Sequence, residues 1–312
     1  MTETLLAPRS GQRRANEDPR MWPVWSRPAE PLEPLPEAAT VASTSFLVMA
    51  MVCLWFILHV LVLGGLEQHR AQDRLYGEFR TQLAAATAPT GGIIPPGSPV
   101  ALLRIPHLGL AQVIVEGTSA GVMLNGPGHR RDTVLPGQAG VSIVYGRARA
   151  FGASFRDLAT KAVGEDLSFV TAQGTSAYRI EGVRRAGDPI PPLLKANEGR
   201  VTFVTAEGNG RLSMLSAGHV IYIDAALKSK SFTAPAGRLN AISPAEMPMA
   251  SDTSAMPVLA LLLGALAVAT VGIVFARRRF GLVLSWVIGA PIILALAWMA
   301  SDLAMYLLPN LL

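Results

Sequence analysis

Hydrophobic residues along the chain follow two different patterns. Uninterrupted apolar runs occupy 44–66, 256–276 and 280–300, and each has the length that a helix needs to cross a bilayer. Between the first and second runs, short apolar or alternating stretches are separated by Gly, Pro, Asn and Asp, which is typical of an all-β domain. Residues 1–43 lack apolar periodicity and are rich in Pro, Arg and Glu, so we expect them to be disordered. The pattern therefore predicts three transmembrane helices and one β domain.

The domain boundaries are placed where these patterns change. After the first apolar run, helical spacing brings Leu75, Phe79 and Leu83 to one face, which predicts a stalk helix. Pro- and Gly-rich stretches then lead into the β domain, and a polar linker follows it. The predicted parts are a disordered cytoplasmic tail (1–43), a first span (44–66), a stalk helix with linker (67–98), the β domain (99–227), a second linker (228–255) and two further spans (256–276 and 280–300).

The β domain is expected to hold seven or eight short strands, which favours a barrel or a sandwich. One short helix is expected within it, at 154–161. The candidate strands are 100–105, 112–115, 141–145, 166–171, 177–183, 200–205 and 219–224.

Charged residues near the apolar runs predict the orientation of the spans. Arginines precede the first run, and Arg277, Arg278 and Arg279 occupy the turn between the last two. Because basic segments beside spans stay on the cytoplasmic side, both clusters predict a multi-pass protein of the plasma membrane with a cytoplasmic N-terminus and an extracytoplasmic β domain. Asp302 lies near the outer end of the last span, where we expect a carboxylate that reaches solvent; an intramembrane functional acid is the alternative.

Composition supports a membrane protein and argues against a nucleic-acid binder. Half of the residues are hydrophobic and 16% are charged, which is too apolar for an ordinary soluble domain. The net charge of +5 does not indicate nucleic acid, because the arginines are scattered and no basic module with interleaved aromatic residues is present. Cys53 is the only cysteine, so no intramolecular disulfide can form.

Several motifs of the β domain, taken in their order along the chain, resemble the sortase family in its actinobacterial form. The resemblance extends over 72–227 and implies a closed eight-stranded β-barrel at the outer face of the membrane. In active members it implies a cysteine transpeptidase, which cuts a sorting signal and transfers the protein to a cell-wall or pilin amine in the envelope of Gram-positive bacteria. The motifs are LYGEFR at 75–80, LLRIPHLGL at 102–110, VEGT at 115–118, LNGPGH at 124–129, TVLPGQ at 133–138 and FGASFRDL at 151–158.

The resemblance also implies three catalytic positions, and this chain departs from the family at each of them. Arg147 stands where a histidine follows a glycine, and Ala206 stands where the cysteine ends a strand. His219 stands where an arginine opens the final strand, with Arg211 as the alternative for that role. The family's chemistry needs a thiolate, and the single thiol of Cys53 lies inside an apolar run. We therefore expect no thiol-based catalysis.

The same positions indicate a binding cleft without its catalytic groups. Arg147 is expected either to hold a carboxylate or a phosphate, since guanidinium groups pair with such anions, or to be a surface arginine facing solvent. Glu207 directly follows Ala206 and is expected near the same ligand. The candidate cleft residues are Arg147, Thr205, Ala206, Glu207, Arg211 and His219.

No metal site and no cofactor are predicted. His107, His129 and His219 show no compact ligand spacing with the acids of the β domain, and His129 is expected to be a structural turn residue. We expect a catalytically inactive sortase-like membrane protein that binds another envelope or secreted protein or peptide as a scaffold or accessory component. The alternatives are an enzyme with a non-cysteine mechanism that acts on cell-envelope peptides on the same fold, and a barrel that serves only as a spacer.

Overall fold

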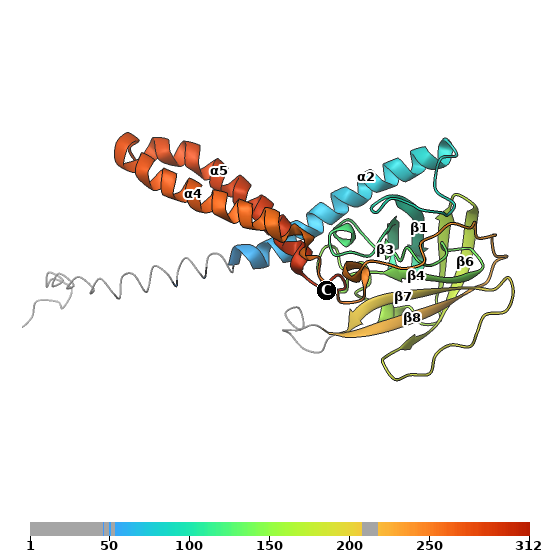
Figure 1. The fold of residues 1–312 in the computed structure, drawn as a ribbon. Helices are drawn as coiled ribbons and strands as arrows, with labels where there is room; N and C mark the ends of the chain where they lie inside the picture. The colour runs from blue at the N-terminus through green and yellow to red at the C-terminus, as the bar shows by residue number, and fades with distance from the viewer. Residues whose placement is uncertain (1–45, 47–49, 51–53, 208–217) are drawn as a thin grey trace, which may run out of the picture. The chain divides into compact units, whose positions relative to one another are not determined.

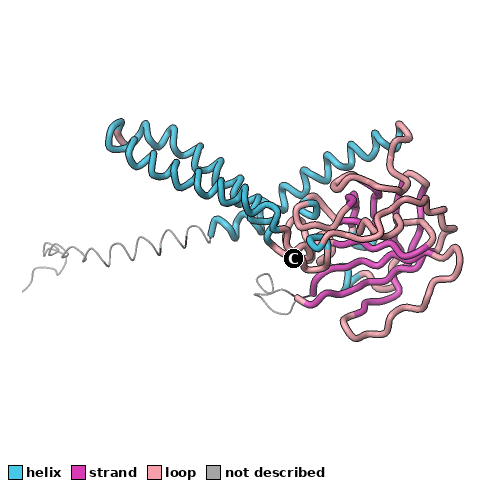
Figure 2. Tube along the Cα trace, viewed as in Figure 1, coloured by secondary structure: helices cyan, strands magenta, loops and turns pink. Residues whose placement is uncertain are grey.

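Eight strands of the middle part of the chain close into a barrel (Figures 1 and 2). The computed structural model describes residues 46, 50, 54–207 and 218–312. Around the barrel the strands follow the order β1-β2-β3-β4-β7-β8-β6-β5, and the pairing of β1 with β5 closes it. The strands are β1 (Pro99–Ile105), β2 (Leu110–Glu116), β3 (Gly128–His129), β4 (Gly140–Tyr145), β5 (Asp166–Thr171), β6 (Gly174–Arg184), β7 (Gly199–Glu207) and β8 (His219–Leu227).

The closed eight-stranded barrel confirms the expected fold class. Each of the seven candidate strands corresponds to an observed one. The eighth, β3, is only two residues long and is held between parallel β2 and antiparallel β4, so it is too short to show a periodic pattern in the sequence. The expected helix at 154–161 is shorter than predicted, because only α3 (Leu158–Lys161) is helical.

The barrel interior is filled by apolar side chains from alternate strand positions. Phe203 of β7 lies at its centre, where its ring meets Phe155 edge to face at 5.3 Å and stacks near Phe169 at 6.1 Å between centroids. All three rings are buried. Burying each stabilises the fold by roughly 1.5–3 kcal/mol, and the aromatic pairs add to this.

The helix predicted as a stalk lies against the barrel. A π-helical turn, η2 (His59–Leu63), leads directly into α2 (Gly64–Ala84). Leu75 and Phe79 are buried in a cluster with residues of β1 and β2. Gln72 bridges to β2, since its Oε1 accepts from the Val113 N–H at 2.7 Å and its Nε2 donates to the Val113 carbonyl at 3.0 Å. The side chain of Gln72 thus pairs with β2 much as another strand would.

Two helices of the C-terminal part form a hairpin, α4 (Met256–Phe280) followed by α5 (Leu282–Ala304) (Figure 1). They are joined at Gly281, whose φ of 85° is a conformation that favours glycine. The three arginines predicted to form the turn lie instead at the end of α4.

Both hairpin helices are long and apolar enough to cross a membrane. Within the described residues, the stretches that meet this test by length and composition are Thr253–Ile273 and Val283–Leu307. Most of the first half of the predicted span 44–66 lies outside the described residues, which resume as helix at residue 54.

The segment between the barrel and the hairpin, predicted as a linker, contacts the barrel along its length. The Phe232 N–H donates to the Gly137 carbonyl at 2.8 Å, and the Thr118 hydroxyl donates to the Glu246 carbonyl at 2.7 Å. Glu246 is buried and lies 3.4 Å from Arg131. The short 3-10 helices of the structure are η3 (Pro106–Leu108), η4 (Val122–Leu124), η5 (Pro244–Glu246), η6 (Thr253–Ala255) and η7 (Met305–Leu307).

We predict that Gln72→Ala lowers the free energy of unfolding of the full chain by about 1–3 kcal/mol, because it leaves the buried N–H and C=O of Val113 without partners. Denaturant unfolding in detergent measures this. The control is Gln82→Ala on the same helix, where the amide donates only to Glu78 at the surface. Equal effects of the two substitutions would contradict the strand-like role of Gln72.

Candidate functional site

The three positions that the sortase resemblance assigns to catalysis lie at the ends of adjacent strands. β7 pairs with β4 in parallel and with β8 in antiparallel fashion. Arg147 follows the end of β4 by two residues, Ala206 is the penultimate residue of β7, and His219 is the first residue of β8. Strand pairing therefore brings together residues that are about 60 and 70 positions apart in the sequence.

Ala206 lies on the outer face of the barrel wall. Successive side chains of a strand point to opposite faces. Val201 and Phe203 belong to the barrel core, whereas Val204 and Ala206 belong to a separate apolar cluster with Tyr145 of β4. Ala206 nevertheless has only 6% of its surface exposed. Another part of the chain must therefore cover this outer face.

Residues 305–312, which we call the covering segment, fill the position in front of Ala206. Leu311 is fully buried in the same cluster as Ala206, together with Met123 and Ala148. Its carbonyl accepts from the Ala148 N–H at 3.0 Å. Burying a leucine side chain stabilises this arrangement by about 1.5–3 kcal/mol. The covering segment thus shares an apolar cluster with Ala206, the position at which the sortase resemblance implies a cysteine.

Asn310 anchors the covering segment through polar contacts. The side chain is fully buried, and its Nδ2 donates to the Thr118 carbonyl at 2.7 Å and to the Met247 carbonyl at 2.9 Å. Its main-chain N–H donates to the Ala250 carbonyl at 3.0 Å. A buried amide that makes such hydrogen bonds specifies one docking position, because any shift leaves polar groups unpaired. The covering segment is therefore held by both apolar burial and directed bonds.

Arg147 is buried, and the expectation that it faces solvent is wrong. It is 2% exposed, because the covering segment and the loop after β4 enclose it. Its Nη2 donates to the Ala120 carbonyl at 3.0 Å, its Nη1 lies 3.5 Å from the Leu312 main-chain oxygen, and its guanidinium lies 5.3 Å from the Phe151 ring centroid. Burial lowers the pKa of Arg147 to about 10, so the group stays charged at neutral pH.

The remaining candidate residues do not join Arg147 in an open cleft. Glu207 accepts two hydrogen bonds from Arg185, at 2.7 and 2.8 Å, and these bonds lower the pKa of its carboxyl. His219 is exposed opposite Glu207. Thr205 is buried opposite Ile221, a residue of the barrel core. Arg211 lies outside the described residues.

His129 was expected to be a structural turn residue, but it lies in strand β3. It is 1% exposed, and its Nδ1 lies 2.8 Å from the Glu116 carboxylate, across the pair formed by β2 and β3. Its Nε2 donates to the Val134 carbonyl at 2.9 Å. This pair fixes β3 within the barrel.

An open groove continues along the same outer face, and sequence reasoning missed it. Its volume is about 260 Å³, and strands β4, β7 and β8 form its floor with Tyr145, Val204 and Tyr222. Ile190 and Pro191 of the loop between β6 and β7 form one wall. Each of these strands carries only one basic or aromatic side chain in the groove, namely Tyr145, Arg200 and Tyr222, so no pattern along the sequence indicates it. Such positions become neighbours only through strand pairing.

Three arginines line this groove, and their pairing differs. Arg184 pairs with Asp224, and Arg130 pairs with Asp132 at 2.8 Å. The guanidinium of Arg200 donates to the Pro192 carbonyl at 3.1 Å, and it forms no ion pair with a carboxylate of the described residues. Arg200 is thus the groove cation available to an acidic ligand.

The barrel is similar to a sortase domain. The family model for the sortase domain matches residues 103–224, from within β1 to within β8. A search of curated proteins finds no match.

Solved sortase structures are similar to this chain over about half of its length. A Clostridium perfringens sortase D5 transpeptidase is 22% identical, with a TM-score of 0.41 over 51% of this chain and 99% of that one. Sortase E from Streptomyces avermitilis is 25% identical, with a TM-score of 0.36 over 44% and 91%. A sortase from Corynebacterium diphtheriae is 22% identical, with a TM-score of 0.38 over 51% and 97%.

We predict that Leu311→Ala opens the position in front of Ala206, because losing a buried leucine side chain costs about 2–5 kcal/mol. A thiol introduced by Ala206→Cys in a Cys53→Ser background reports this opening through its rate of maleimide labelling. Adding Leu311→Ala should raise that rate at least about tenfold, since about 1.4 kcal/mol corresponds to a factor of ten.

The matched control for this labelling experiment is Leu307→Ala. Leu307 belongs to the same segment, is only partly buried, and contributes to none of the apolar clusters around Ala206. Fast labelling before Leu311 is changed would show that the covering segment does not protect this position.

Proposed function

We propose that this chain is a catalytically inactive sortase-fold membrane protein that binds a protein or peptide partner as a scaffold or accessory component of the cell envelope. The observation that carries the proposal is the environment of Ala206. The expected nucleophile position bears a methyl group, which is buried in the same apolar cluster as Leu311. A methyl group has no lone pair, so no neighbouring residue can activate it for attack.

The position of Arg147 also argues against proton transfer in this cleft. A general acid must release a proton near neutral pH, and a guanidinium with a pKa of about 10 holds its protons there. Its donors point to the main-chain oxygens of Ala120 and Leu312 rather than to an open cavity. In this proposal Arg147 holds the covering segment and takes no part in chemistry.

The open groove supports the binding role. It combines an aromatic floor, with Tyr145 and Tyr222, and the guanidinium of Arg200. Ile190 and Leu193 of the adjoining loop are 87% and 97% exposed, which is unusual for large apolar side chains. An extended peptide with apolar side chains and a carboxylate fits this chemistry, because guanidinium groups pair with carboxylates and aromatic rings bury apolar groups.

The membrane arrangement in this proposal follows from charge and hydropathy. Helices α4 and α5 would cross the plasma membrane, with the three arginines at the end of α4 on the cytoplasmic side. The first apolar run would form a third span, with its preceding arginines also cytoplasmic. The barrel would then lie outside the cytoplasm, at the cell surface, where envelope proteins and peptides are its available partners.

We predict that the full chain in detergent binds sorting-signal peptides with an acidic residue, and that Arg200→Ala weakens this binding about 10- to 100-fold. A hydrogen bond to a charged group contributes about 1.5–3 kcal/mol, which corresponds to such factors. Calorimetry measures the affinity. The control is Arg179→Ala on β6, which removes an exposed arginine that pairs only with Asp166. If Arg200→Ala and Arg179→Ala bind the peptide with equal affinity, the groove is not the binding site.

We expect the full chain to cleave none of the peptides that it binds, with or without an added amine acceptor. Mass spectrometry of the peptide pool checks this. Turnover that disappears in Glu207→Gln or His219→Ala would establish the alternative, an enzyme with a non-cysteine mechanism. A chain that neither binds nor cleaves, and tolerates every groove substitution, would support the spacer function.

A further inference from the structure

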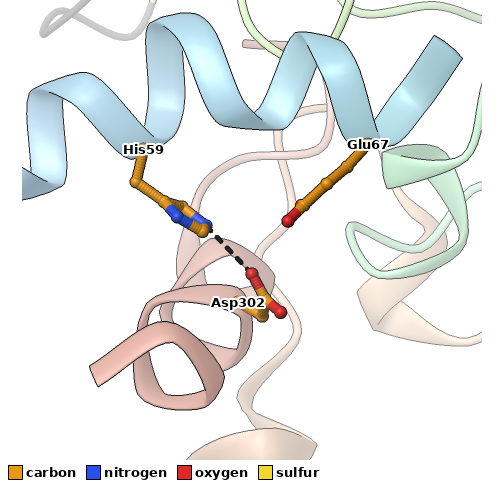
Figure 3. A group of neighbouring side chains, drawn as sticks. All are labelled: His59, Glu67 and Asp302. Atoms are coloured by element: carbon orange, nitrogen blue, oxygen red, sulfur yellow. Dashed lines mark ion pairs between the residues drawn. The ribbon is translucent and has the colours of Figure 1, made fainter. Parts of the chain in front are cut away.

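Three side chains from distant parts of the sequence meet beside the apolar helices (Figure 3). His59 and Glu67 extend from one helix toward Asp302 of α5. One possible ligand atom from each lies within 4.8 Å of the others. His59 is fully buried, whereas the Asp302 side chain is 40% exposed and opens the cluster to the surface. Together the three offer one imidazole nitrogen and two carboxylates.

Ordinary pairing does not satisfy these groups. The His59 Nε2 lies 2.9 Å from the Asp302 Oδ1, which is an ion-pair distance. Neither of these buried atoms, nor the His59 Nδ1, makes a hydrogen bond of acceptable geometry to any described residue. When a nitrogen and an oxygen both direct a lone pair at the same metal ion, the two atoms lie close together without being aligned for a hydrogen bond. The His59 Nε2 and the Asp302 Oδ1 have this arrangement. Two ligands about 2.1 Å from one metal ion lie about 3.0 Å apart at a right angle and about 3.4 Å apart at the tetrahedral angle typical of Zn²⁺, so binding Zn²⁺ needs His59 and Asp302 to separate by about 0.5 Å.

The helix is deformed where it presents two of these ligands. In a regular α-helix, with 3.6 residues per turn, His59 and Glu67 would be offset by about 80° around the axis. The π-helical turn at His59–Leu63 is wider and takes up an extra residue, which reduces this offset. Both side chains consequently extend to the same side of the helix, toward Asp302 (Figure 3).

An aromatic wall surrounds the histidine. The Trp298 ring stands edge-on to His59 at 5.6 Å between centroids, and the Trp55 ring lies at 6.5 Å. The Trp55 Nε1 donates to the Ser301 hydroxyl at 2.9 Å, so this indole N–H is not available to His59, Glu67 or Asp302. The Trp298 side chain hydrogen-bonds to the carboxyl groups of Glu67 and Asp302. One neutral donor does not balance two carboxylates, so in these surroundings they still favour a cation.

We propose that His59, Glu67 and Asp302 bind a divalent transition-metal ion of the Zn²⁺ type, with water completing its coordination. Imidazole nitrogen together with carboxylate oxygen is a ligand set that suits Zn²⁺, whereas Mg²⁺ and Ca²⁺ prefer oxygen alone. The ligands are at positions 59, 67 and 302, so no compact spacing in the sequence could reveal the site. The proposal departs from the expectation that the protein has no metal site, because the three ligands come together only when the two helices pack.

The bound ion would join the helix that begins before α2 to the end of α5. Asp302 precedes the covering segment by only three residues. Metal binding would therefore hold in place the part of α5 from which the covering segment extends to Leu311. This site does not depend on whether the barrel groove binds a peptide, so the two proposals can fail separately.

The first test is metal binding to the full chain in detergent, after removal of metal with a chelator and dialysis. Elemental analysis after loading with Zn²⁺ should find one equivalent per chain, and unfolding should shift to higher temperature with Zn²⁺ but not with Mg²⁺. Glu67→Gln should weaken Zn²⁺ binding about 10- to 100-fold, because it removes one ligand while leaving the contact between His59 and Asp302 in place.

Two controls on the same helix address unspecific binding. His69→Ala removes an exposed histidine, and Glu78→Gln removes an exposed carboxylate, and neither should change the Zn²⁺ affinity. Co²⁺ loading gives a direct readout, since visible absorption bands should appear in the original chain and be lost in His59→Ala. Zn²⁺ binding that is absent, or that survives Glu67→Gln unchanged, would overturn the proposal and leave His59 and Asp302 as an interhelical ion pair.

Discussion

The structure depends on a strand, β7, that is buried on both of its faces. Its inner side chains, Val201 and Phe203, pack in the barrel core, and its outer ones, Val204 and Ala206, pack under another part of the chain. The outer face of a barrel normally faces solvent. Side chains along such a strand then alternate between apolar ones that point inward and polar ones that point outward. The outer face of β7 is apolar, so it requires a cover. The covering segment at 305–312 meets that requirement.

This cover buries Arg147 and Ala206, two of the positions that the sortase resemblance assigns to catalysis. An alanine at the nucleophile position would leave an apolar surface in an open cleft, and Leu311 removes that surface from water. Arg147 is then a buried cation whose Nη1 and Nη2 face the main-chain oxygens of Leu312 and Ala120 and whose guanidinium lies near the Phe151 ring, while its Nε has no partner among the described residues. The adjoining groove remains open, and in the proposed function a peptide would contact Arg200 and Tyr222 there, because Tyr145 is buried.

The covering segment also couples the barrel to the apolar helices. It continues from α5, whose Asp302 faces His59 and Glu67 on the helix that runs into α2. That helix in turn pairs with β2 through Gln72. Both helices are therefore joined to the barrel, α5 through the covering segment and the other helix through Gln72.

Patterns that are local in the sequence were sufficient for much of the fold. Period-two alternation located seven of the eight strands, uninterrupted apolar runs located the hairpin helices, and the lack of a second cysteine followed from counting. The motifs of the sortase resemblance identified the barrel, and the family match over 103–224 agrees. Each of these signals depends on residues near one another in the chain, where period, propensity and composition operate.

What the sequence left undetermined depends on contacts between distant residues. Arg147 and Leu312 meet only because α5 returns its end to the barrel, and the burial of Arg147 is a property of that contact. The predicted last span ended at residue 300 and no role was predicted for Leu311, although Leu311 is buried in the apolar cluster that contains Ala206. The cluster of His59, Glu67 and Asp302 likewise needs two helices to pack together. Tertiary structure alone decided these features, because burial and ligand geometry are set by which surfaces meet and not by the order of residues along the chain.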